Sequence, residues 1–437
     1  MKATQQSYNV RMGPSVVFDK SALQALSMDE SVWFDQFLMG NITPLFYVET
    51  LADLEKGVRK GKTPEQVVGG LAAKTPLEAV PNVHHRRMYL QELAGDPQPM
   101  DGRPVLAGGT PKRAPDGKVA LHFKEFPEAA ALARWQNGEF IEIERMVAKD
   151  WRRELAEQDV DARIGVLKNI LPTGLRISNL SGLKTFIDEF CSQSDKHVLN
   201  LMMDVLDVPG PGRPKVIHKW ELAGKPPLNR FAPYAIHVFK VDLLYYLGIY
   251  RGFISGERAS NKADMAYLYY VPFCDVFLSG DNLHARTVPL FLSDEQSFVD
   301  TQDMKAALKE LDEHFDKLPD EIKQRGVIQF TTYPPSTIHN AITDIWDKHV
   351  RSDWREIAAR DEARLLDPQN KPNHGSVADI IEDMDRSIPM VGEDAKVTTE
   401  DVDQMYITRK IPGHRGKWRM LSQDIMDEIN AKKESSD

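Results

Sequence analysis

Four acidic residues stand where they could act together on a metal ion: Asp19, Glu49, Asp264 and Asp281. Carboxylates held a few ångströms apart repel one another, and a bound cation allows all of them to stay ionised. Oxygen ligands without histidine or cysteine favour Mg²⁺ or Mn²⁺ over Zn²⁺. Such an ion can activate a water molecule and stabilise the charge that develops on a phosphodiester during hydrolysis. The acids therefore indicate metal-dependent phosphoryl chemistry, provided that the fold brings them together.

Two of the acids, Asp19 and Asp281, each follow a short apolar run. The runs at 15–18 and 275–279 are rich in β-branched and aromatic residues, which is typical of strands covered on both faces of a parallel sheet. Ligand sites in such sheets lie at the carboxyl ends of the strands. If the two strands are neighbours, both carboxylates meet at one edge, whereas Asp275, which begins the second run, is expected at the opposite edge.

The third acid, Glu49, is expected on a helix with clear end signals. Thr43 suits the N-cap, Pro44 the first helical position, and Gly57 the left-handed residue just past the end. Asp53 lies four residues after Glu49 and shares its helical face. That face can look toward the cleft at the sheet edge.

The fourth acid, Asp264, is expected in the first turn of a helix capped by Ser260. The chain then turns and returns through the strand that ends before Asp281. The start of this helix and the end of this strand are therefore expected to be neighbours.

The segments that carry these acids resemble the PIN-domain nucleases. The resemblance lies in three stretches: Val16-Val17-Phe18-Asp19-Lys20-Ser21, Thr43-Pro44-Leu45-Phe46-Tyr47-Val48-Glu49, and Asp264 followed by Val276-Phe277-Leu278-Ser279-Gly280-Asp281. In that family an Asp-x-Ser/Thr after the first strand, a helical Glu, an Asp at a helix start and a Ser/Thr-x-Asp bind Mg²⁺ or Mn²⁺ and hydrolyse RNA or DNA. The match covers about residues 14–57 and 258–300.

The resemblance implies roles for six residues. The four acids would be catalytic, as metal ligands or water-positioning groups that act directly or through water: Asp19, Glu49, Asp264 and Asp281. Ser21 and Ser279 would hydrogen-bond to this set. Asp53, which shares the helical face of Glu49, is a further candidate for a supporting acid. The implied activity is hydrolysis of phosphodiester bonds in RNA or DNA by a Mg²⁺- or Mn²⁺-dependent nuclease.

The predicted fold class is α/β, a PIN-like parallel sheet flanked by helices, with large additions. The core is expected at 14–60 and 234–300, separated by a mostly helical insertion at 61–233 and followed by a helical C-terminal extension at 301–437 that ends in a frayed tail. Helices are predicted at 304–318 and 338–360. Neither addition has a counterpart in the compact members of the family, which leaves the substrate open.

Composition favours a globular protein of the cytoplasm. Of 437 residues, 42% are hydrophobic and 27% charged, which are globular values. The only two cysteines, Cys191 and Cys274, lie in unrelated surroundings, which favours a reducing compartment. The start of the chain lacks the apolar segment of a secretory signal, and no uninterrupted apolar run is long enough to span a membrane.

The formal net charge of −10 provides no general attraction to nucleic acid, so binding would need local basic patches or bound cations. One such patch is the C-terminal stretch with Arg409, Lys410, Arg415, Lys417, Trp418 and Arg419. It could grip a nucleic-acid backbone and stack a base, or dock on the chain's own acidic stretch at 379–403. The helical additions could also carry a homo-oligomer contact or a protein partner.

Two alternatives to a nuclease remain open. A non-catalytic PIN-like scaffold could use the same fold to bind RNA or a protein. A haloacid-dehalogenase-like phosphatase would use Asp19 as its nucleophile, but that class expects a second aspartate two positions later, where this chain has Ser21.

Overall fold

A five-stranded parallel sheet lies at the centre of the computed structural model, in the order β3-β2-β1-β6-β7. Its strands are β1 (Ser15–Phe18), β2 (Met39–Ile42), β3 (Val80–Pro81), β6 (Val276–Ser279) and β7 (Ser297–Asp300). The structure describes residues 13–367 except 59, 78, 114–116, 124–125, 158, 173–175 and 259, together with 388–389, 404–407 and 411–427 except 425. The predicted α/β class with a parallel sheet is confirmed.

The strand order reverses between β1 and β6. From β1 the chain adds β2 and then β3 on one side, and after a long excursion it adds β6 and then β7 on the other side of β1. Phe18 pairs with Leu278, so β1 and β6 end level with each other. A crevice at the carboxyl ends of strands where the order reverses is the usual ligand site of open parallel sheets.

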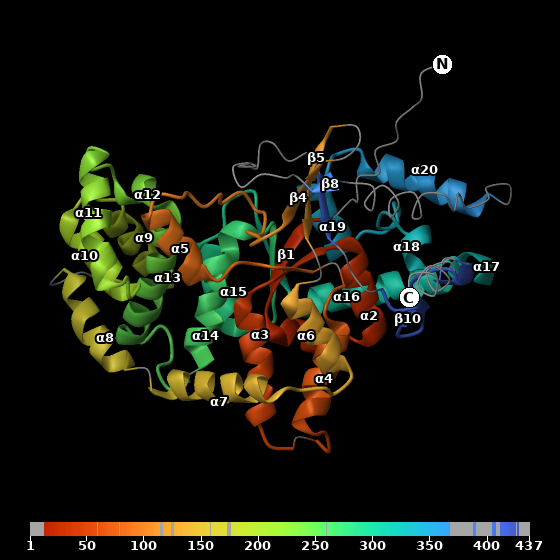
Figure 1. The fold of residues 1–437 in the computed structure, drawn as a ribbon, viewed down its shortest axis with the longest axis horizontal. Helices are drawn as coiled ribbons and strands as arrows, with labels where there is room; N and C mark the ends of the chain where they lie inside the picture. Colours follow the sequence, from red (N-terminus) through yellow and green to blue (C-terminus); the bar gives the residue numbers. More distant parts are fainter. Residues whose placement is uncertain are drawn as a thin grey trace.

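Both faces of the sheet are buried because its central strands are apolar throughout. Val17 and Phe277 point into one hydrophobic cluster, while Val16, Phe18 and Val276 point into another. This alternation follows from the two-residue period of a strand. Figure 1 shows one group of helices around α13 on one side of the sheet and a second group around α16 and α20 on the other.

The Val17 cluster is built from helices that precede β6. They are α5 (His85–Leu93), α8 (Val160–Leu167), α9 (Leu180–Cys191), α10 (Lys196–Val205), α11 (Arg213–Leu222), α12 (Leu228–Phe231), α13 (Pro233–Tyr250) and α14 (Ser260–Tyr267). The helix α13 is buried along nearly its whole length, which explains its nearly continuous apolar sequence.

The Val16 cluster combines early and late segments of the chain. Its helices are α1 (Lys20–Ala25), α2 (Met28–Phe37), α3 (Pro44–Leu51), α4 (Pro64–Lys74), α6 (Pro127–Gln136), α7 (Glu142–Glu157), α16 (Thr301–Asp316), α17 (Asp320–Lys323), α18 (Val327–Phe330), α19 (Ala341–His349) and α20 (Trp354–Leu366). The single helix predicted at 338–360 is therefore two helices. Asp347 accepts hydrogen bonds from Trp354 and Arg355, which holds the second helix back against the first.

The insertion expected to be mostly helical also contributes strands. It supplies β3 to the central sheet, and it supplies β4 (Thr110–Arg113) and β5 (Val119–Phe123), which form a second sheet with β8 (Ile388–Pro389) and β9 (Gln404–Ile407) in the order β8-β4-β5-β9. The extension expected to be helical likewise contains the hairpin of β10 (His414–Arg415) and β11 (Trp418–Arg419). Short strands in segments rich in proline and glycine resemble loops in sequence, because only pairing with distant strands stabilises them. Among the described residues, no helix combines the length and the apolar character needed to cross a membrane.

Candidate active site at the carboxyl edge of the sheet

Asp19 and Asp281 lie at the same edge of the sheet, as predicted. Each is the N-cap of the short helix that follows its strand: α1 (Lys20–Ala25) after β1, and α15 (Asn282–Thr287) after β6. Asp275 lies at the opposite edge, where its carboxylate accepts hydrogen bonds from the backbone and side chain of Ser15. The neighbouring parallel strands therefore bring together two acids that are far apart in the sequence.

The Asp19 carboxylate is held by four protein donors. Its Oδ1 accepts hydrogen bonds from the Ser21 hydroxyl at 2.7 Å and the Ala22 amide at 2.8 Å. Its Oδ2 accepts one from the Ser279 hydroxyl at 2.5 Å and lies 3.2 Å from Nδ1 of His284. Both serines expected from the sequence thus hydrogen-bond to this acid, and the Asp19 residue is only 5% exposed.

His284 is fully buried beneath Asp19. Its Nε2 lies 2.7 Å from the carbonyl oxygen of Asp264, so this nitrogen carries a proton. Its Nδ1 lies 2.7 Å from the Ser279 hydroxyl, which already donates to Asp19 and so accepts from the imidazole. Two protonated ring nitrogens make His284 an imidazolium, paired with the Asp19 carboxylate.

The pKa shifts of this pair agree with the hydrogen bonds. Burial alone would raise the pKa of Asp19, but the hydrogen bond and charge of His284, with the Ser279 and Ala22 donors, lower it below its usual value. Burial alone would lower the pKa of His284, but the hydrogen bond and charge of Asp19 raise it. Each partner therefore favours the charged form of the other.

Glu49 is fixed by two side chains that had no assigned role in the sequence. Lys20 Nζ lies 3.2 Å from Oε1 of Glu49, and the Tyr267 hydroxyl donates to Oε2 at 2.8 Å. The same ammonium lies 3.3 Å from Asp53, which also pairs with Lys56. The expected supporting acid Asp53 is therefore neutralised by lysines and faces no open space, since it is 4% exposed.

Asp264 differs from the other acids because its carboxylate has no hydrogen-bond or ion-pair partner within the part of the chain that the structure describes. Burial raises its pKa to about 7; the charge of His284 opposes this rise, and the negative charges of Glu49, Asp281 and Asp19 add to it. Asp264 lies on α14, which packs against two helices. One is α3, which carries Glu49, and the other is α15, which Asp281 caps. Asp264 thus experiences the combined repulsion of the three other predicted acids.

Asp281 is the second acid with spare acceptor capacity. Its Oδ1 accepts a hydrogen bond from the Leu283 amide at 2.6 Å, while its Oδ2 has no partner among the described residues. The residue is half-buried. At this edge of the sheet, the carboxylate oxygens that have no hydrogen-bond or ion-pair partner among the described residues, and so could bind a ligand, belong to Asp264 and Asp281.

The helices that position the acids were predicted in part. Thr43 caps α3 and Pro44 is its first residue, which confirms the start of the Glu49 helix. The predicted end of this helix was wrong. The α-helix ends at Leu51 and is followed by a 3₁₀ turn at Ala52–Glu55, and Gly57 does not have a positive φ. The helix α14 begins at Ser260 itself, which places Asp264 in its second turn and not its first.

Three residues of the site have no role in the sequence-based prediction. Lys20 directly follows Asp19, Tyr267 follows Asp264 by three positions, and His284 follows Asp281 by three. On a helix, a spacing of three places two side chains on one face, so Tyr267 and His284 could have been proposed as partners of the acids. For Lys20, the only feature in the sequence that could have suggested a role is its position next to Asp19.

The residue types at this edge suit a hard divalent cation. Within the described ranges, no three histidine, cysteine, aspartate or glutamate side chains are arranged so as to hold a metal ion. The donors that remain available, on Asp264 and Asp281, are carboxylate oxygens, which Mg²⁺ and Mn²⁺ prefer. Burial raises the pKa of Asp264, and the neighbouring acids add to this rise; a bound cation would favour its ionised form.

The basic C-terminal stretch is partly buried. Arg415 is 5% exposed and forms an ion pair with Asp35 at 2.8 Å, and Trp418 is 3% exposed and packs edge-on against Trp33 at 4.7 Å. Lys417 pairs with Asp312 at 2.9 Å. Arg419 makes a hydrogen bond to Gln423 at 3.0 Å, and Arg409, Lys410 and nearly all of the acidic stretch at 379–403 lie outside the described residues. Neither Arg415 nor Trp418 is accessible to a nucleic acid in this arrangement, because both side chains hold the C-terminal hairpin against α2.

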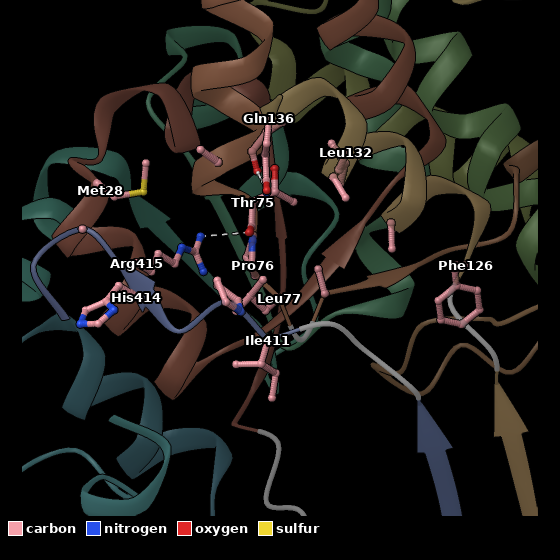
Figure 2. Close-up of a pocket in the computed structure, with 17 residues that line it drawn as sticks. Met28, Thr75, Pro76, Leu77, Phe126, Leu132, Gln136, Ile411, His414 and Arg415 are labelled. Carbon is pink, nitrogen blue, oxygen red and sulfur yellow. Dashed lines mark hydrogen bonds between the residues drawn. The ribbon is translucent and has the colours of Figure 1, made fainter. Parts of the chain in front are cut away.

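Arg415 also borders a cavity of about 420 Å³ between α4, α6 and the C-terminal segment. Figure 2 shows its guanidinium hydrogen-bonded to Thr75, with Pro76, Leu77 and Leu132 lining the same cavity. None of the four acids lines this cavity. It is therefore separate from the carboxyl edge of β1 and β6.

Comparisons of this chain with protein-family models, with curated proteins and with solved structures found no match.

Proposed function

We propose that this chain is a PIN-like, Mg²⁺- or Mn²⁺-dependent nuclease that hydrolyses phosphodiester bonds of RNA or DNA at the carboxyl edge of β1 and β6. The observation that carries the proposal is the Asp264 carboxylate. It has no hydrogen-bond or ion-pair partner among the described residues, burial raises its pKa to about 7, and the charges of Glu49, Asp281 and Asp19 add to this rise, near the point where the strand order reverses. A buried, unbalanced charge of this kind is typical of functional sites.

The charges around the site support one divalent ion. Five carboxylates take part, on Asp19, Glu49, Asp53, Asp264 and Asp281. Three cationic side chains lie among them, Lys20, Lys56 and His284. The two negative charges that remain equal the charge of a single Mg²⁺ or Mn²⁺.

Asp264 and Asp281 would hold this ion, with Asp19 and Glu49 contributing negative charge directly or through water. When bound, the ion would supply positive charge to the phosphate oxygens and make water more acidic. The four donors on Asp19 keep its carboxylate from rotating, and Lys20 and Tyr267 do the same for Glu49. Such fixed orientation lets the acids present the same charge geometry in every catalytic cycle.

A phosphatase with Asp19 as nucleophile is less well supported. Both oxygens of Asp19 already face two donors each, and the residue is 5% exposed. An attacking carboxylate needs an oxygen that can reach phosphorus, and here each oxygen is directed at the protein. The non-catalytic scaffold remains the second candidate, and activity measurements separate it from the nuclease.

The test measures cleavage of labelled single-stranded RNA and DNA by the full chain with Mn²⁺. We expect Asp264→Asn and Asp281→Asn to lose activity by about a hundredfold or more, since each removes charge that stabilises the transition state through the ion. Asp294→Asn is the matched control, because Asp294 is exposed and precedes β7 on the far side of the sheet. Equal cleavage by all four proteins would contradict the proposed site.

The thermal stability of the wild-type chain with and without Mn²⁺ completes the test. A ligand that binds only the folded state must stabilise it, so the nuclease is expected to melt at a higher temperature with Mn²⁺. No cleavage and no stabilisation would instead favour the scaffold.

A further inference from the structure

The helix α7 (Glu142–Glu157) has three large apolar residues exposed on the face turned away from the protein. Ile143, Met146 and Val147 are 63%, 55% and 43% exposed. They lie three and four positions apart, so they form one continuous stripe on the helix. Scattered apolar residues are ordinary on a protein surface, but a contiguous group usually marks an interaction site.

The inward face of the same helix carries the fully buried Ala148 together with polar groups that have partners. Glu144 is 8% exposed and pairs with Arg134 at 2.5 Å, and Arg145 pairs with Glu65 at 2.7 Å. Arg152 donates a hydrogen bond to the carbonyl oxygen of Ala52 at 2.9 Å. Salt bridges and hydrogen bonds thus help to attach the inward face of α7 to the protein, while Ile143, Met146 and Val147 face outward.

Figure 1 shows α7 along the lower margin of the molecule, between the two groups of helices. It lies against α3 and the 3₁₀ turn that follows α3, which contact its inward face. A helix at the margin of the molecule can meet the same helix of a second molecule without rearrangement of either fold.

Two exposed charges on one flank of the stripe indicate what covers it. Glu142 and Lys149 are seven residues apart, which places them two turns apart on the same side of the helix. Neither has an ion-pair partner within the described part of the chain. In an antiparallel pair of identical helices, the same flank of each helix meets. Glu142 of each copy would then lie opposite Lys149 of the other copy, which gives two such pairs. A parallel pair would instead place this flank next to the opposite flank of the partner helix, so Glu142 and Lys149 of the two copies would not meet.

We propose that the outward face of α7 is a self-association surface on which two copies of this chain pair antiparallel. The two-fold axis would pass near Arg145 and Met146, the apolar stripes would cover each other, and two Glu142–Lys149 pairs would flank them. Two-fold self-pairing of one patch is the commonest form of oligomer. This inference is independent of the proposed nuclease activity.

The test determines the oligomeric state of the full chain by sedimentation velocity over a range of micromolar concentrations. We expect a dimer for the wild type and a monomer for the double variant Ile143→Ser/Val147→Ser. Glu142→Lys or Lys149→Glu alone should weaken the dimer about tenfold or more, since each replaces two attractions by repulsions. The combined Glu142→Lys/Lys149→Glu variant restores opposite charges across the axis and should dimerise like the wild type.

Every substituted position is exposed, so each variant is expected to keep its fold, and circular dichroism and thermal melting of each protein check this. Met146→Cys adds a geometric readout, because residues near a two-fold axis lie close to their own copies and should form a disulfide-linked dimer under mild oxidation. Ser181→Cys, on the exposed face of α9, is the matched control. A monomeric wild type, a dimer unaffected by Ile143→Ser/Val147→Ser, or a charge swap that fails to restore dimerisation would each overturn the proposal.

Discussion

The ammonium group of Lys20 lies 3.2 Å from the carboxylate of Glu49, inside the acidic edge of the sheet. Lys20 is 8% exposed, and its Nζ also contacts Asp53. The chain thus carries a permanent positive charge among its own acids. This fixed cation, together with the imidazolium of His284, limits the charge that a bound metal ion must supply.

Replacing Lys20 by methionine tests this role. Without the ammonium, Glu49 and Asp53 lose a buried counter-charge, and breaking such a pair typically costs about 3–5 kcal/mol. We expect Lys20→Met to lower the melting temperature without metal and to show a larger stabilisation by Mn²⁺ than the wild type. Lys309→Met is the control, because Lys309 is 69% exposed and pairs only weakly with Glu313. A Mn²⁺ shift equal to that of the wild type would contradict the compensating role.

The number of ions per chain follows from the same charge balance. Titration of the metal-free protein with Mn²⁺, followed by electron paramagnetic resonance of the free ion, should give one tight site per chain. Binding of two tight ions would show that the resident cations do not limit occupancy, although the nuclease proposal itself would remain.

In the absence of metal, Asp264 is expected to lower the free energy of unfolding at neutral and higher pH, where its buried carboxyl must ionise. Its pKa is raised to about 7, so the folded state holds a proton that the unfolded state has already lost above pH of about 4. The stability that this group contributes is therefore present at low pH and is lost as the pH rises from about 4 to about 7.

Asp264→Asn should remove this pH dependence. We expect the metal-free variant to be more stable than the wild type at pH 8, by about 1–2 kcal/mol after allowance for solvent screening, and to gain nothing from Mn²⁺. Urea denaturation at pH 5 and pH 8 measures both effects, with Asp294→Asn as the surface control. A variant less stable than the wild type at pH 8 would mean that Asp264 has a stabilising partner.

The placement of the acids was predictable where it depended on sheet geometry. Asp19 and Asp281 follow strands that sequence identifies by their apolar, β-branched character, and parallel strands place their ends at one edge. The capping residues Thr43 and Pro44 likewise fixed the start of the Glu49 helix. These features are local, so the sequence contains them directly.

The partners of the acids were not predictable to the same extent. Tyr267 reaches Glu49 across 218 positions of the chain, and His284 reaches Asp19 across 265. Such contacts depend on how α14 packs against α3 and α15. The spacing of three from Asp264 and Asp281 places Tyr267 and His284 on the right helical faces but does not reveal which distant acid each contacts. The strand β3 was missed for a similar reason: it is two residues long and is a strand only because β2 lies beside it.

The C-terminal basic stretch illustrates a different limit, because charge alone does not reveal burial. Arg415 forms an ion pair with Asp35, which lies 380 positions earlier in the sequence, and both side chains are 4% exposed. We expect Arg415→Met to destabilise the chain by about 3–5 kcal/mol, since the buried Asp35 carboxylate would lose the Arg415 guanidinium that pairs with it.

Arg419→Ala is the matched control for this prediction. Arg419 has one hydrogen bond, to Gln423, that no buried acid depends on, so its loss should change stability by less than about 1 kcal/mol. Guanidinium denaturation of both variants provides the comparison. Similar stability of Arg415→Met and the wild type would indicate that the hairpin is only loosely held.

The buried pair of His284 and Asp19 should give the protein a stability maximum in mildly acidic solution. The pKa of His284 is raised, so its contribution is full below about pH 6.5 and is lost as the pH rises through the folded-state pKa. The pKa of Asp19 is lowered, so its contribution is present above about pH 4 and is lost as the pH falls through its folded-state pKa. Between these limits both partners are charged and the pair is intact.

His284→Gln removes the imidazolium while keeping a group that can hydrogen-bond. At pH 6 the variant should lose about 3–5 kcal/mol relative to the wild type, because Asp19 stays buried with its charge uncompensated. At pH 9 the difference should be smaller, since the wild-type imidazolium has by then lost part of its advantage. Urea denaturation at the two pH values measures the change, with the exposed His339→Gln as control. A difference that is the same at both pH values would mean that His284 is neutral in the folded protein, and the charge balance that leaves room for one divalent ion would then have to be redrawn.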